Sequence, residues 1–82
     1  MGCLIVFRSV TYAQNGSSHL SRNHITAVIT RPPTGLAKGG CSYALKVRNQ
    51  DLSRALDILT RAGVPWSSAF RKTNTGWQEV AL

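Results

Sequence analysis

Acidic residues are scarce in this sequence. The 82-residue chain has three Asp and Glu against ten Lys and Arg, which gives a formal net charge of +7. Catalysis by paired carboxylates needs two acids in one site, and Asp51 and Asp57 both fall in a predicted helix, so we exclude this class of enzyme. The positive charge favours encounter with nucleic acid, acidic proteins or anionic metabolites, although solubility alone would also explain it.

Long hydrophobic runs are also missing. The apolar run at residues 4–7 is too short for a signal peptide or a membrane span, and Arg8 ends it at once. We therefore expect a cytoplasmic protein without membrane contact. A chain of this length has room for one thin hydrophobic core, so we predict a single domain over residues 1–82.

Residues that bind metals are few and scattered. The chain has two cysteines, Cys3 and Cys41, and two histidines, His19 and His24, with no CxxC or HxxxH pair among them. Structural zinc sites bring such pairs together, so we predict neither a metal nor a cofactor. A lone histidine in a helix or at the start of a strand is more often a surface or capping residue than a catalytic one.

The hydrophobic pattern predicts four strands and two helices. Apolar and β-branched residues favour strands at residues 3–8, 24–30, 41–48 and 66–71, and residues 76–82 add a last edge strand or a docked tail. One helix is expected over residues 10–20, with Ser9 as its N-cap, although Asn15-Gly16 weakens it. A proline pair and three glycines between residues 32 and 40 predict a loop.

The clearest helix is predicted for residues 51–62, where leucines and alanines form one apolar stripe. Asn49 or Asp51 can cap its start, and Gly63 can take the left-handed position after its end. The resulting order, βαββαβ, together with right-handed crossovers, predicts an α+β protein. This is a ferredoxin-like two-layer sandwich with an antiparallel sheet and two helices on one face.

Cys41 is the strongest candidate for chemistry. In this fold Cys3 and Cys41 begin two antiparallel neighbouring strands and lie at opposite ends, too far apart for a disulfide. Gly39 and Gly40 leave backbone N–H groups free to face an anion, and Arg31 and Lys38 add positive charge, so a thiolate at Cys41 would be stabilised. The alternative is that Cys41 is a small buried apolar residue at the head of a core strand.

A second candidate is a partner-binding sheet face with Arg8, Lys46 and Arg48. The exposed face of such a sheet commonly binds RNA through stacking aromatic residues. Tyr43 is out of phase with Lys46 and Arg48, so the third strand offers no aromatic residue for sequence-specific RNA binding. Nonspecific binding of nucleic-acid phosphates stays open.

The order of elements and the segment Cys41-Ser42-Tyr43-Ala44-Leu45-Lys46-Val47 resemble the putative Se/S carrier protein-like family. The resemblance spans most of the chain. In that family a proline stands near the start of the loop and Cys-Gly opens the third strand. Here Pro32-Pro33 and Cys41 stand at these places, whereas Ser42 replaces the glycine and Pro33 or Thr34 occupies the position after the proline where arginine is common in the family.

The resemblance implies that Cys41 carries sulfur or selenium, as a persulfide or selenosulfide, from a donor such as a cysteine desulfurase to an acceptor enzyme. Such a protein is a carrier rather than an enzyme that turns over. The competing hypothesis is a basic binding or regulatory module for a protein or for nucleic-acid phosphate, in which Cys41 is structural. Sheets of this type often pair through an edge strand or an exposed face, so a homodimer fits both hypotheses.

Overall fold

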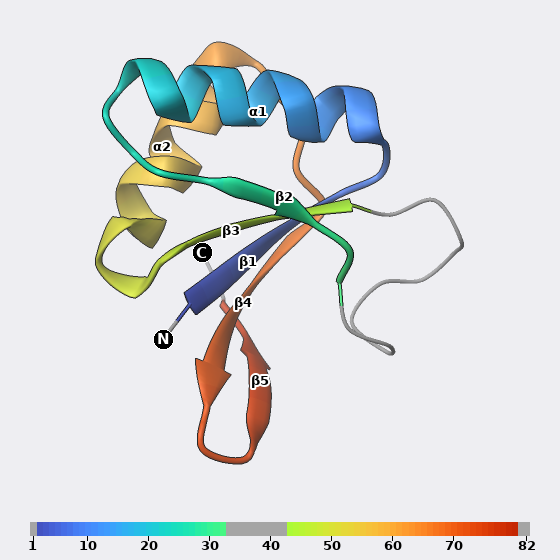
Figure 1. Ribbon diagram of the computed structural model, residues 1–82, viewed down its shortest axis with the longest axis vertical. Coiled ribbons are helices and arrows are strands. Elements are labelled where there is room, and N and C mark those ends of the chain that lie inside the picture. The colour runs from blue at the N-terminus through green and yellow to red at the C-terminus, as the bar shows by residue number, and fades with distance from the viewer. Residues whose placement is uncertain (1, 33–42, 81–82) are drawn as a thin grey trace.

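The computed structural model describes residues 2–32 and 43–80 and has an α+β architecture (Figure 1). In chain order the elements are β1 (Gly2–Phe7), α1 (Val10–Arg22), β2 (Val28–Thr30), β3 (Tyr43–Arg48), a 3₁₀ turn (Asn49–Asp51), α2 (Leu52–Ala62), β4 (Ser68–Thr73) and β5 (Gly76–Glu79).

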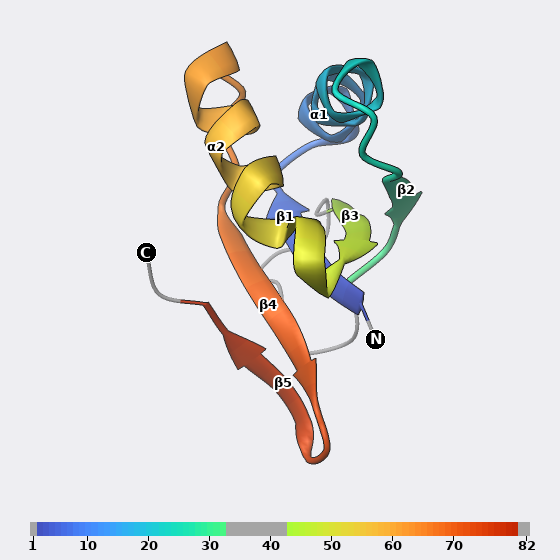
Figure 2. The same cartoon turned by 90° about the vertical axis from the view of Figure 1, so that its left-hand side faces the viewer.

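The five strands form one antiparallel sheet in the order β2-β3-β1-β4-β5. Both helices lie on the same side of it, and the β4–β5 hairpin projects beyond them (Figure 2). The predicted ferredoxin-like sandwich is therefore confirmed. β5 pairs with the outer edge of β4, so the C-terminal segment forms the predicted edge strand.

The core lies between the sheet and the helices, on what we call the helix face. Alternate residues of β1, namely Cys3, Ile5 and Phe7, point to this face and are fully buried. β3 contributes Leu45 and Val47 in register with them. The helices cover these side chains with the predicted stripe of α2 and with three residues from α1 and the segment after it; the covering residues are Leu52, Ala55, Leu56, Leu59, Ala13, Leu20 and Ile25.

The opposite side of the sheet, called the second face below, carries a smaller apolar cluster. Leu4 and Val6 of β1 and Ala44 of β3 are buried there, with Phe70 and Trp77 packed against them and half-buried. The strand pairing places a further set of residues on this face; these are Gly2, Lys46, Arg48, Lys72 and Glu79.

The strand predicted at residues 24–30 is shorter than expected. α1 continues to Arg22, and the backbone then turns at His24, which has a φ of 62°. The N–H of Ile25 donates to the carbonyl of Leu20 at 2.9 Å and so closes the end of the helix. Ile25 is buried because it packs under the helix end and not because it belongs to β2.

Ser9 caps α1 as predicted: its Oγ accepts a hydrogen bond from the N–H of Tyr12 at 3.3 Å. Gly63 has a φ of 75° and takes the left-handed position that ends α2. The predicted side-chain cap of α2 is wrong, because Asp51 occupies the N-cap position without a side-chain hydrogen bond and Asn49 accepts from Cys3 instead. Residues 41 and 42 of the predicted third strand lie outside the described residues.

Gly16 explains why a helix-weakening residue stands in the middle of α1. A Cβ at this position would lie 3.1 Å from side-chain carbons of Leu59 and Phe7 and 3.2 Å from one of Leu45. These distances are tighter than ordinary packing contacts, and all three neighbours are buried in the core. Glycine therefore lets α1 approach both α2 and the sheet closely.

We predict that Gly16→Ala lowers the free energy of unfolding by up to about 2 kcal/mol. Overpacking costs about 1–3 kcal/mol, and the gain from helix propensity offsets at most about 1 kcal/mol of this cost. Thermal unfolding should shift down by about 4–8 °C per kcal/mol for a domain of this size. Asn15→Ala, at the exposed neighbouring position, is the control and should be neutral or stabilising. A stabilised Gly16→Ala protein would contradict the packing argument.

Candidate functional site

Four strand ends meet along one edge of the sheet, which we call the loop edge. β1 and β2 end there, and β3 and β4 begin there. The register shows this directly, since Phe7 pairs with Tyr43, Thr30 with Ala44 and Val6 with Ser68.

Arg31 and Tyr43 meet at this edge. The guanidinium carbon of Arg31 lies 5.3 Å from the centre of the Tyr43 ring, a cation–π contact. Arg31 follows β2 and Tyr43 opens β3, so the contact joins the chain on both sides of residues 33–42. Of the residues predicted to form the thiol site, Arg31 is thus placed at the loop edge, while Lys38, Gly39, Gly40 and Cys41 lie outside the described residues.

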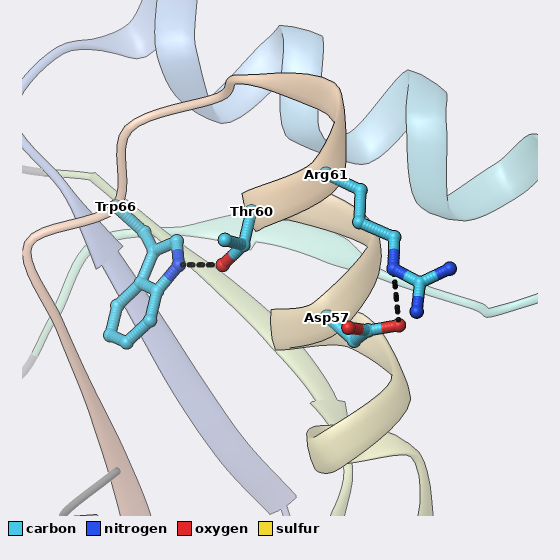
Figure 3. Close-up of polar contacts among 4 residues, drawn as sticks. All are labelled: Asp57, Thr60, Arg61 and Trp66. Carbon is cyan, nitrogen blue, oxygen red and sulfur yellow. Dashed lines mark hydrogen bonds and ion pairs between the residues drawn. The ribbon is translucent and has the colours of Figure 1, made fainter.

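Arg8 lies at the same edge, directly after β1, and is exposed. Together with Tyr12 and the chain at Pro65, Trp66 and Ser67, it lines an open hollow of about 410 Å³. Trp66 is oriented by its indole N–H, which donates to the Oγ1 of Thr60 at 3.4 Å (Figure 3).

The loop edge is electropositive. It contains two arginines and the N-terminus of α1, whose first turn has no acidic residue. The three acids of the chain are in other segments: Asp51 precedes α2, Asp57 pairs with Arg61 on the surface of α2 at 3.2 Å (Figure 3), and Glu79 ends β5. A negative charge at this edge would therefore be stabilised by arginine and by the helix dipole.

Cys3 lies near the other end of β1 and has the environment of a structural thiol. It is fully buried, pairs across the sheet with Val47 and Arg71, and its Sγ donates to the Oδ1 of Asn49 at 3.3 Å. Burial raises the pKa of the Cys3 thiol, and the neighbouring Arg71 offsets only part of this effect. At neutral pH Cys3 is thus a protonated thiol without access to solvent.

The predicted partner-binding residues do not form one group. Lys46 and Arg48 are neighbours on the second face, where they pair with Leu4 and Gly2, whereas Arg8 lies beyond the opposite end of β1. Phe70 and Trp77 share the second face with Lys46 and Arg48, a grouping that the sequence alone did not predict. In β4 and β5 these two residues stand at alternate positions with Lys72 and Glu79, which was the available sequence signal. The sequence does not tell which face of the sheet those positions occupy, because that is fixed by the strand pairing.

Within residues 2–32 and 43–80, no three His, Cys, Asp or Glu side chains gather in a group able to hold a metal ion. Neither helix in that part of the chain is long and apolar enough to cross a membrane.

The fold and the electropositive loop edge define a small α+β protein of the ferredoxin-like class. The family described as "Putative Se/S carrier protein-like" matches residues 2–71, and the chain belongs to this family. The match extends from β1 to Arg71 in β4, so β5 lies beyond it. No curated protein and no solved structure matches the chain.

We predict that Cys3 makes stability fall at alkaline pH. Because its pKa is raised in the folded protein, the unfolded state loses the proton first as the pH passes the ordinary thiol value of about 8.5. The contribution of Cys3 to the free energy of unfolding is therefore complete below that pH and decreases above it. Denaturant unfolding of wild type and Cys3→Ala from pH 7 to 10 should show the stability difference shifting toward the variant. A difference that does not change with pH would contradict the buried thiol.

Proposed function

We propose that this protein carries sulfur or selenium on Cys41. Membership in the Se/S carrier-like family supports this chemical class. The observation that carries the proposal is the state of the other cysteine. The sequence has two cysteines, and Cys3 is fully buried, hydrogen-bonded and held as a thiol, so it is unsuited to exchange sulfur with another protein.

The electrostatics of the loop edge support the same proposal. A carrier thiol must ionise to attack a donor, and the thiolate is stabilised by nearby positive charge. Arg31 is held by Tyr43, which follows Cys41 by two residues in the sequence. Arg8 and the N-terminus of α1 add positive potential at that edge. In this proposal Lys38 adds a further cation, and the backbone N–H groups of Gly39 and Gly40 donate to the thiolate.

The transfer step is an ordinary thiol exchange. The Cys41 thiolate attacks the outer sulfur of a persulfide on a donor such as a cysteine desulfurase. The donor S–S bond breaks as a new S–S bond forms on Cys41, and the donor leaves as its thiolate. An acceptor thiolate then attacks the outer sulfur of the Cys41 persulfide; a new S–S bond forms on the acceptor, and Cys41 leaves as its thiolate. With a donor that holds selenium at the outer position, the bond formed on Cys41 is a selenosulfide.

Intact-mass analysis tests the carrier directly. After incubation with a cysteine desulfurase and cysteine, wild type and Cys3→Ala should each gain the mass of one sulfur atom, and treatment with dithiothreitol should remove it. Cys41→Ser should gain none while keeping its circular dichroism spectrum. Loading of Cys41→Ser, or no loading of wild type when a known carrier is loaded in parallel, would refute the proposal.

The role of Arg31 is tested separately by alkylation with iodoacetamide in the Cys3→Ala background, where Cys41 is the remaining thiol. Arg31→Gln should shift the pH midpoint of alkylation upward and slow the reaction at pH 7 by about fivefold, as expected for losing one charge pair in water-like surroundings. Arg22→Gln, at the distant end of α1, is the matched control and should leave the profile unchanged. Equal profiles for all three proteins would remove Arg31 from the proposed site.

A further inference from the structure

Three cations gather on the second face, at the end of the sheet opposite the loop edge. Lys46 and Arg48 are alternate residues of β3, and Lys72 lies on β4 two residues after Phe70. All three are exposed. The pairing of Leu4 with both Lys46 and Phe70 shows that the two strands present these residues on one face, on either side of β1.

Gly2 lies between the cations and has no side chain to separate them. It pairs with Arg48, and a Cβ at its position would lie 3.1 Å from the Cε of Lys46. The Lys46 side chain therefore lies over Gly2. Arg48 of β3 and Lys72 of β4 stand on either side of Gly2, two strand spacings or about 10 Å apart, and Gly2 places no side chain between them.

Two aromatic side chains flank the cations. Trp77 of β5 pairs with Lys72, whose Nζ lies 4.9 Å from the centre of the indole ring. Phe70 lies next to Lys72 along β4 and rests on the same apolar cluster as Trp77. Both rings are half-buried, so each is fixed by packing from beneath and still reaches the surface. These strands supply the aromatic side chains that β3 lacks on this face.

We propose that this patch, formed by Lys46, Arg48, Phe70, Lys72 and Trp77, binds single-stranded nucleic acid. The cations neutralise backbone phosphates, and Trp77 and Phe70 stack against bases, the combination that sequence-tolerant single-strand binding requires. An acidic protein segment would use the cations but has no bases to stack on the rings. Glu79, opposite Phe70, is the acid of β5 on this face and limits the patch on that side.

The patch is independent of the carrier proposal. It lies at the other end of β1 from Arg8, and β5, which supplies Trp77, is outside the family match. Nucleic-acid binding should therefore persist in Cys41→Ser.

The test is fluorescence titration with an oligodeoxythymidylate of about 10 nucleotides, within the usual site size. In a Trp66→Phe background Trp77 is the remaining tryptophan, so quenching reports on the patch. Three phosphate contacts predict a slope of log K against log salt of about −2. Each of Lys46→Gln, Arg48→Gln and Lys72→Gln should reduce that slope by about 0.7. Arg54→Gln and Arg61→Gln on α2 are the controls and should leave it unchanged.

The role of the Trp77 ring in binding is tested by the fluorescence anisotropy of a labelled oligonucleotide, because this signal does not depend on tryptophan emission. Trp77→Leu, which keeps an apolar side chain on Leu4 and Val6, should weaken binding about 5- to 150-fold at an unchanged salt slope, and Trp77→Phe should restore much of it. The proposal is overturned if the α2 controls reduce the slope as much as the patch variants do. Equally tight binding of polyglutamate would also overturn it, because charge alone would then suffice.

Discussion

The structure depends on the burial of β1 between two neighbouring strands and two apolar clusters. Residues Cys3 to Phe7 are all buried, and their backbone groups pair with β3 on one side and β4 on the other. A shift of one residue in either pairing would turn the core side chains of β3 or β4 to the second face, so the alternation of buried and exposed residues in these two strands fixes their register on β1. That register decides which side chains meet at the loop edge and which share the second face.

The order of the elements could be predicted because periodicity and end signals agreed. The apolar stripe of α2, the αL glycine after it and the Ser9 cap were all visible in the sequence. β2 was predicted too long because Ile25 has the alternation of a strand residue, while its backbone N–H is used to close α1. Asn49 was predicted as a helix cap because sequence alone does not reveal a competing donor, here the Cys3 thiol from 46 residues away.

The candidate site was predictable only in part, because the contacts between its residues depend on how the strands pair. Arg31 was named from charge and nearness in sequence, and its contact with Tyr43 depends on how β2 and β3 pair. The joint position of Lys46 and Arg48 followed from alternation within one strand. Placing Phe70 and Trp77 on the same face needed three strand pairings: β3 with β1, β1 with β4 and β4 with β5. The register of each pairing decides which residues share a face, and the sequence of one strand alone does not contain that register.

Because Cys3 is buried, its reactivity reports on local opening of the structure. The thiol lies in the central strand under the helices, shielded from solvent and hydrogen-bonded to Asn49, so a reagent can reach it only when the helices move off the sheet or the strands separate. Its rate of modification therefore measures how often this part of the core opens, much as amide exchange does for a backbone N–H. Loosening of the sheet by a bound partner would thus appear as faster modification of a residue that the partner never touches.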